Sequence, residues 1–400
     1  MSVVCPADIL LPRVGDMTAW SVIACDQFTS QGEYWDAAEK RVGEAPSALR
    51  LMLPEAWLGT PRAQGSEERI ADTMRRYLDE GVFTEQKNCF IYLERTQPDG
   101  RVRRGLMAAL DLERYDFTPG ARAPIRATEG TVEDRLPPRV RIRRLAALEM
   151  PHVMVLMDDR DDRVLGPLER ARHNMKKLYD FDLMLSGGHV AGWRVDGVLS
   201  ETVSRALDSL GESALQREKY GAAAANGSLT LAVGDGNHSL AAARRFWEQR
   251  RETLSPAERE THPARFALAE LCNLHESALD FEPIHRLLLD TDTADFATAL
   301  EKERGGWEDP SRTVGERVAA AEEFCQRYIA AHGGRVDYIH GDAAARRLGE
   351  RPGCAAVLLP PISKEGLFLS VLSGGALPRK SFSMGHAEDK RYYLECRRLL

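Results

Sequence analysis

Apolar and polar positions along this chain form both strand-like and helix-like patterns. The apolar run Leu229 to Val233 predicts a short buried strand, and the run Leu240 to Arg250 after it predicts a helix. Phe90 to Arg95 and Val102 to Leu110 predict two more strands. Pro98-Asp99-Gly100 lies between them and predicts a hairpin turn.

The other patterns mix the two kinds of element without regular alternation. Ser66 to Leu78 predicts a helix with Ser66 as its N-cap and Gly81 beyond its end. Further helices are predicted over Gln31–Val42, Leu165–Tyr179, Val198–Leu210, Asp292–Arg304, Thr313–Ala331 and Ser363–Leu372, and further strands over Val153–Met157, Arg265–Leu274, Val336–Ile339 and Ala355–Leu359. Strands and helices in this order favour an α+β fold or an irregular α/β fold, and α+β is the prediction.

Composition limits the classes of function. The chain has 400 residues, 43% hydrophobic residues and a formal net charge of −7, which is typical of a globular protein and argues against nucleic-acid binding. No apolar run approaches the roughly 18 to 20 residues of a membrane span. Met1 to Arg13 lacks the basic start of a signal peptide, so we expect a cytoplasmic protein. The seven cysteines are scattered and predict no zinc site.

A local group of arginines departs from the acidic average. Arg135, Arg139, Arg141, Arg143 and Arg144 alternate closely in one short segment. The preferred interpretation is the solvated face of a strand, and the alternative is a wall that faces phosphate.

The strongest candidate for chemistry is Gly234-Asp235-Gly236-Asn237-His238-Ser239, where the predicted strand turns into the predicted helix. Such a junction leaves backbone N–H groups and the positive end of a helix dipole free for an anion such as phosphate. Glycines allow a sharp bend and a close approach to a ligand. Asp235 adds a base, Asn237 an amide and His238 a proton carrier.

Several segments together resemble the DUF1015 family of uncharacterised bacterial proteins. They are Asp235-Gly236-Asn237-His238-Ser239 with Ala241-Ala242-Ala243, Glu129-Gly130-Thr131 with Asp134-Arg135-Leu136, Pro283-Ile284-His285-Arg286, Leu377-Pro378-Arg379-Lys380-Ser381 and the pair Cys25-Asp26. The resemblance implies a mixed-sheet core like that of ParB and sulfiredoxin, with large helical and strand insertions. We expect residues 1–290 to form this core with an N-terminal lobe, and residues 291–400 to form a C-terminal α/β lobe that packs back on it.

The resemblance also implies the members of a site. The implied catalytic residues are Asp235, His238 and Glu129; the implied phosphate- or nucleotide-binding residues are Gly234, Gly236, Asn237, Ser239, Arg135, His285, Arg286, Lys380 and Ser381; the implied metal ligands are Asp235 and Asp134. Mg²⁺ and ADP or ATP are the implied cofactors. Glu129, Asp134 and Arg135 fit either a ligand cleft or a surface loop. Ser239 stands where the family shows arginine, so Arg286 or Arg135 must supply the missing cation.

The function expected from these features is phosphoryl transfer or hydrolysis on a small metabolite, serine or phosphoserine being the first choice. The partner is a phosphorylated small molecule or a nucleotide, and a homodimer is compatible with the sequence. One alternative is a non-catalytic nucleotide-binding switch. Another is a metal-dependent hydrolase that uses His238, His275, Glu276 and His285. The motif lacks the third glycine of a dinucleotide fingerprint, which argues against a Rossmann dehydrogenase.

Overall fold

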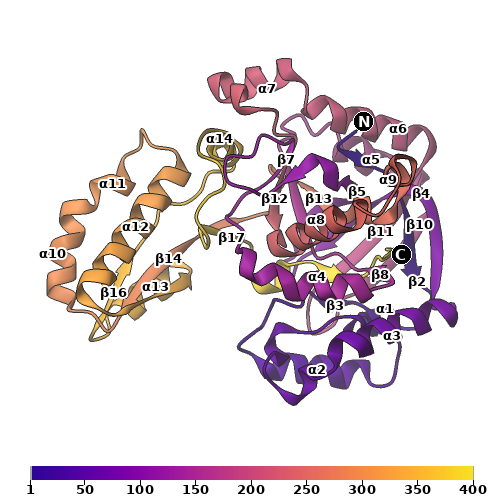
Figure 1. Ribbon diagram of the computed structural model, residues 1–400, viewed down its shortest axis with the longest axis horizontal. Helices are drawn as coiled ribbons and strands as arrows, with labels where there is room; N and C mark the ends of the chain where they lie inside the picture. The colour runs from indigo at the N-terminus through magenta and orange to yellow at the C-terminus, as the bar shows by residue number, and fades with distance from the viewer. Residues whose placement is uncertain (1, 400) are drawn as a thin grey trace.

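The computed structural model describes residues 2–399, which are built around a mixed β-sheet (Figure 1). The sheet contains, in spatial order, β10 (Lys177–Asp182), β11 (His189–Val195), β4 (Phe83–Thr96), β5 (Val102–Asp111), β13 (Phe266–Asn273), β9 (Met154–Met157), β12 (Leu231–Asp235), β7 (Ile125–Ala127) and β6 (Tyr115–Asp116). β1 (Val4–Cys5) pairs with β5, and β2 (Ala7–Pro12) pairs with β4. β13 runs parallel to β9, and β7 runs parallel to both β12 and β6, whereas the other pairs are antiparallel. This mixed sheet confirms the α+β class.

Two locally encoded features form as expected. β4 and β5 pair antiparallel across the predicted turn, where Gly100 has a φ of +87°. β12 is followed directly by α8 (Asn237–Arg251), so the predicted strand-to-helix junction is confirmed.

Helices cover the sheet, and several of them pack on one another. The helices of this main body are α1 (Met17–Trp20), α2 (Gly32–Val42), α3 (Ser66–Asp79), α4 (Leu136–Leu145), α5 (Leu165–Ala171), α6 (Gly197–Leu210), α7 (Ser213–Tyr220), α8 and α9 (Pro256–Thr261). α4 packs on α8, and α3 packs on α4. The N-cap of α3 is Gly65 rather than the predicted Ser66. No helix within residues 2–399 is both long and apolar enough to cross a membrane.

The helix predicted over Leu165–Tyr179 is wrong in its second half. α5 ends at Ala171, and the segment from Lys177 onward is β10 instead. Lys177 pairs with Trp193 of β11, so a backbone ladder to a distant strand replaces the local helix.

The arginine segment is a helix and not the preferred strand. Pro137 and Pro138 occupy the first turn of α4, a position that proline favours in helices. The helical period separates the side chains, because residues four apart share one face. Arg139 and Arg143 share a face and bind Glu55 and Glu149, whereas Arg141 and Arg144 are exposed.

A smaller sheet projects from the main body, at the left of Figure 1. β14 (Phe281–Leu289) links the two: it pairs first with β17 (Phe382–Met384) and then with β15 (Arg335–His340) and β16 (Cys354–Val357). The helices of this part are α10 (Thr293–Glu303), α11 (Gly305–Glu308), α12 (Val314–His332) and α13 (Asp342–Gly349). The last helix, α14 (Lys364–Gly374), packs on the main body, where Phe368 is buried in one cluster with Leu156 of β9. The division of the chain after residue 290 stays a prediction, and its terminal residues 1 and 400 lie outside the described residues.

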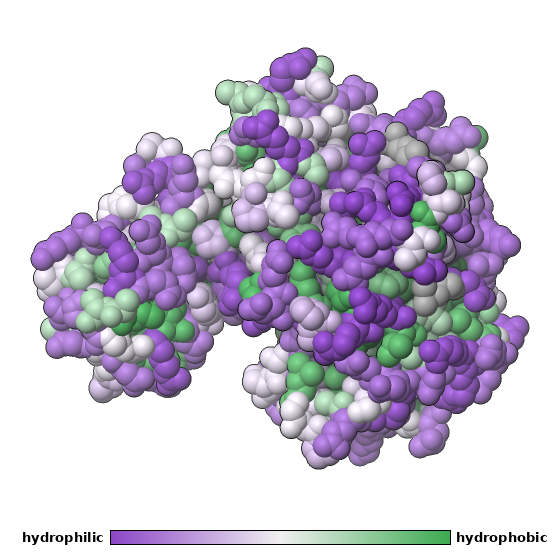
Figure 2. Space-filling model, viewed as in Figure 1, coloured by the Kyte–Doolittle hydropathy of each residue, from purple (hydrophilic) through white to green (hydrophobic). Residues whose placement is uncertain are grey.

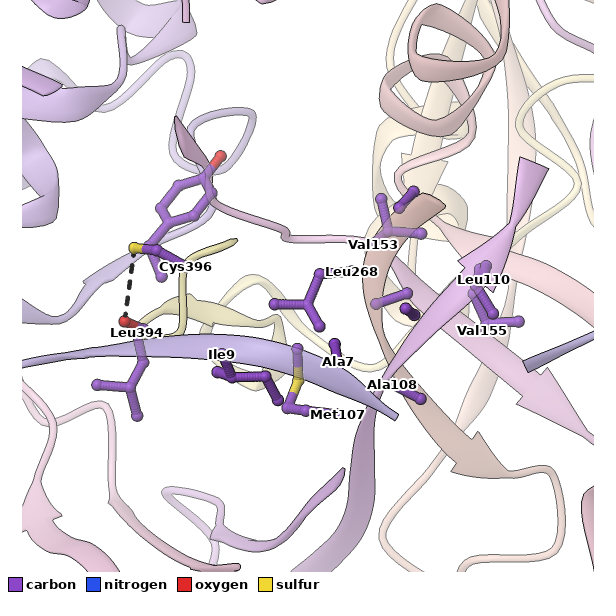
Figure 3. Close-up of a cluster of buried hydrophobic side chains, with 14 of the residues drawn as sticks. Ala7, Ile9, Met107, Ala108, Leu110, Val153, Val155, Leu268, Leu394 and Cys396 are labelled. Carbon is purple, nitrogen blue, oxygen red and sulfur yellow. Dashed lines mark hydrogen bonds between the residues drawn. The ribbon is translucent and has the colours of Figure 1, made fainter. Parts of the chain in front are cut away.

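The C-terminal segment returns into the main body. β18 (Tyr392–Tyr393) pairs with β3 (Val22–Ile23), and β19 (Arg397–Arg398) pairs with β8 (Leu148–Glu149). Figure 3 shows Ile9 and Leu268 among the buried side chains of the core, with Leu394 and Cys396 of this segment at its edge. This return places residues from both chain ends beside the strand-to-helix junction.

Candidate functional site

The glycines of the junction serve two different needs. Gly236 is the N-cap of α8 and has a φ of +78°, which side-chain-bearing residues rarely adopt. A Cβ atom on Gly234 would lie 2.5 Å from Met384 Sδ, so this position has no room for a side chain. Together they let β12 turn into α8 while β17 packs closely against the turn.

The first turn of α8 points unused donors outward. Among residues 2–399, the backbone N–H groups of Asn237 and His238 find no acceptor, because an α-helix leaves its first N–H groups without an internal partner. Asp235 Oδ1 accepts the N–H of Gly236 at 2.9 Å, and its Oδ2 lies 3.3 Å from Lys390 Nζ. Asp235 is therefore ion-paired and fixes the turn.

A cavity of about 450 Å³ opens in front of this turn. Of the residues implied by the sequence, those on its wall are Glu129, Arg135, Gly234, Asp235, Gly236, Asn237, His238, Ser239 and Lys380. The segment after β7, the start of α4, the junction and the loop before β17 thus meet at one place.

Glu129 is held by the loop that precedes β17. Its carboxylate accepts backbone N–H groups from Ser381 at 3.0 Å, from Lys380 at 3.3 Å and from Phe382 at 3.4 Å. Burial raises the pKa of Glu129 above its usual value, although these donors oppose the change. Ser381 itself is fully buried and binds the Pro378 carbonyl, so it positions Glu129 from behind the wall.

His238 is neutral in this cavity. The Val132 N–H donates to its Nε2 at 3.2 Å, so Nδ1 carries the proton. Burial and then three nearby guanidinium groups lower the pKa of His238 to about 4. These groups belong to Arg139, Arg135 and Arg379.

The wall carries more positive charge than its own acids neutralise. Arg139 binds Glu55 at 2.7 Å, and Lys390 binds Asp235. Arg135, Arg379 and Lys380, by contrast, form no side-chain ion pair among the residues that the structure describes. These three cations and the free N–H groups of α8 favour an anion in the cavity.

The sequence-based prediction missed several residues of the cavity wall. His152 lies with Nε2 at 3.2 Å from Ser239 Oγ, and its Nδ1 lies 2.8 Å from the Tyr393 hydroxyl. Asp26 lies 4.0 Å from the same Nε2; although burial opposes it, His152 and a neighbouring amide lower the pKa of Asp26. Asp26 and Arg379 belong to segments of the family resemblance, which could have identified them. No motif or spacing marks His152.

Besides Ser381, three implied residues lie away from the cavity wall. His285 is fully buried between the Leu359 N–H and the Asp342 carboxylate. Arg286 is also buried, binds Glu322 at 2.8 Å and donates to the Lys380 carbonyl at 2.9 Å. It supports the loop of Lys380 instead of facing an anion. Asp134 lines a neighbouring cavity and not this one.

The metal-dependent hydrolase requires a cluster of metal-ligating side chains. Within residues 2–399, no group of three or more His, Cys, Asp or Glu side chains could hold a metal ion. His275 binds Asp158, Glu276 binds Arg104, and His285 lies in the smaller sheet.

The comparisons with known proteins give one family and two distant structures. A family model described as "Protein of unknown function (DUF1015)" matches residues 10–398. No curated protein matches the sequence. A mutant of free serine kinase in complex with AMP is 9% identical, with 73% of this chain and 92% of that chain covered and a TM-score of 0.37. A conserved hypothetical protein from Pyrococcus furiosus is 9% identical, with coverages of 72% and 90% and a TM-score of 0.31. Likenesses this distant support no argument about function.

Proposed function

The chain belongs to the DUF1015 family, and on this premise we propose that its central cavity binds the phosphate of a small metabolite or nucleotide for transfer or hydrolysis. The observation that carries the proposal is the meeting of three unpaired cations with the free N–H groups of a helix N-terminus. Phosphoryl transfer depends mainly on positioning and on neutralising charge, which this wall supplies.

Each wall residue has a role that its contacts suit. Glu129, with its raised pKa, accepts the proton of an attacking hydroxyl or water. Neutral His238 donates Nδ1–H to a phosphate oxygen, while Arg135 and Arg379 balance its charge. Ser239 adds a hydroxyl beside His152.

The oxygen donors beside the junction suit Mg²⁺. Asn237 Oδ1 is buried without a hydrogen-bond partner, and Asp235 presents its carboxylate two residues earlier. Carboxylate and amide oxygens, completed by phosphate and water, are ligands that Mg²⁺ prefers. These two side chains would hold the ion, which supplies charge neutralisation to the phosphate when it is bound. Asp134 is left out, because it lies outside the cavity.

Binding tests the anion site first. We expect inorganic phosphate, phosphoserine and ADP to bind the purified chain in isothermal titration calorimetry, and Arg135→Ala to weaken them about 10-fold or more, since a bond to a charged group contributes about 1.5 to 3 kcal/mol. Arg141→Ala is the matched control, because Arg141 lies on the exposed side of α4, 3.9 Å from its nearest carboxylate. Equal affinity in both variants would exclude Arg135 from the site.

Turnover tests the reaction. Phosphate release from phosphoserine, and transfer from ADP or ATP to serine, are assayed with Mg²⁺ present. The proposal expects turnover in one of them and its loss in Asp235→Ala. Tight nucleotide binding without turnover would instead identify a non-catalytic switch. Unchanged turnover in Asp235→Ala would remove Asp235 from the machinery.

A further inference from the structure

A second, apolar cavity of about 630 Å³ lies directly beside the phosphate site, between α3, α4, α8 and the segment around residues 51–58. It shares Cys25, Glu55, Arg135, Arg139, His152 and Ser239 with the first cavity, so the two are parts of one space. Its size falls within the roughly 300 to 1,000 Å³ of small-molecule sites.

The wall of this second cavity, hereafter the apolar compartment, is mainly aliphatic. Ile142 of α4 faces it from one side, Met52 and Leu53 from the segment before α3, and Ala243 of α8 from the base. Figure 2 shows apolar surface along the seam between α4 and the part of the chain that carries α2 and α3. An apolar group that displaces water from an aliphatic wall of this size contributes favourably to the free energy of binding.

The polar groups of the compartment leave little to recognise a nucleobase. Glu149 binds both Arg143 and Arg397, and the Tyr393 hydroxyl is engaged with His152. One buried polar atom of this wall, Arg143 Nε, lacks a partner. Asp134 and Arg135 are the other charged side chains of this wall that form no ion pair within residues 2–399, and both are exposed instead of buried between the helices. The single buried N–H donor cannot read the paired donor and acceptor edge of a base, whereas an aliphatic chain needs neither.

We infer that the substrate is an amphiphile: a phosphate, or the hydroxyl that accepts it, attached to an aliphatic chain that fills the apolar compartment. The inference rests on the proposed phosphate site, because Arg135 and Arg139 at the shared boundary place the charged head beside the junction. The chain then extends between α3 and α4. A substrate of this class binds more tightly than phosphoserine, because phosphoserine has no aliphatic chain to fill the compartment.

Monoalkyl phosphates test this in the full chain. Butyl, hexyl and octyl phosphate, together with phosphoserine and inorganic phosphate, are titrated by calorimetry. We expect about fourfold tighter binding for each added methylene group until the compartment is filled, which corresponds to about 0.8 kcal/mol for each buried methylene. Octyl phosphate that binds no more tightly than inorganic phosphate overturns the inference.

Variants on α4 locate the chain. Ile142→Trp should remove the dependence on chain length and leave inorganic phosphate binding unchanged, whereas Leu145→Trp, on the exposed side of the same helix, should leave both unchanged. Met52→Trp, on the opposite wall, serves if Ile142→Trp does not fold. A dependence on chain length that survives both folded blocking variants contradicts the assignment. The assignment is also contradicted if these variants block AMP binding while the affinity of alkyl phosphates does not depend on chain length.

The phosphate site and the apolar compartment are tested independently. If inorganic phosphate binds and chain length has no effect, the apolar compartment is not a substrate site and the proposed function stands. If affinity rises with chain length but Arg135→Ala changes no affinity, the compartment stands and the phosphate site is wrong.

Discussion

Two titratable side chains in the cavity show what burial does to single residues. Burial raises the pKa of Glu129 and lowers that of His238, because it disfavours the charged form of each. The three guanidinium groups near His238 act in the same direction as its burial. The wall thus holds a carboxyl group of raised pKa and a neutral imidazole, while its positive charge comes from arginine and lysine.

The role of Glu129 predicts the acid side of the pH profile. Turnover should fall as the pH decreases through the raised pKa of Glu129, because the carboxylate must be ionised to accept a proton. Glu129→Gln should lower kcat by about 100- to 10,000-fold, the usual contribution of a general base. Glu133→Gln is the control, since Glu133 is exposed and pairs with Arg245. If the residual turnover of Glu129→Gln keeps the same acid limb, another group is the base.

At the scale of elements, the junction of β12 and α8 is encoded locally, whereas its surroundings are not. A buried strand, a left-handed glycine and a helix follow one another within one short segment, so periodicity and composition suffice to predict them. β10 shows the opposite case, because its strand exists only through its ladder to β11.

Gly236 tests the geometry of this junction. Gly236→Ala should destabilise the fold and lower phosphate affinity, because alanine is strained at a φ of +78° and its Cβ would lie 3.0 Å from Val153 Cα. Gly120→Ala is the matched control: Gly120 has a φ of +77° but nothing within 4 Å of an added Cβ. The control should cost about 1 to 2 kcal/mol and leave affinity unchanged. Equal costs measured by denaturant unfolding would mean that Val153 adjusts freely.

For the whole molecule, a buried ionic network ties the C-terminal segment to the main sheet. Arg391 lies 2.6 Å from Glu270 of β13 and also binds Glu395, while Arg103 of β5 lies 3.3 Å from the same Glu270. Glu270 is only 1% exposed. Because Lys390 and Tyr393 flank Arg391 and contact the site, this network also fixes part of the cavity wall.

Replacing Glu270 should show how much this network contributes to the free energy of unfolding. Glu270→Gln should destabilise the protein by about 3 to 5 kcal/mol, since it leaves the buried Arg103 without its carboxylate and leaves Arg391 with Glu395 alone. Although burial opposes it, the two arginines lower the pKa of Glu270 to about 2. Its stabilisation is therefore complete above about pH 4.5, its unfolded value, and is lost as the pH falls toward 2.

Denaturant unfolding from pH 7 to pH 3 measures both effects. Glu252→Gln, an exposed carboxylate in the loop after α8, is the control and should match the unsubstituted chain. A Glu270→Gln variant as stable as this control would show that the network contributes nothing net. An unchanged acid dependence in that variant would assign the lost stability to other carboxylates.

Local features of the chain were enough for the hairpin of β4 and β5 and for the junction with its free N–H groups, because strand and helix periods and a glycine turn depend on neighbouring residues. The family resemblance added Glu129, Arg135 and Lys380, which lie on the same wall. Only the tertiary structure placed His152 against Ser239 and turned Arg286 away, because such neighbours come from strand pairing and from the return of the C-terminal segment. No spacing along the chain records those distances.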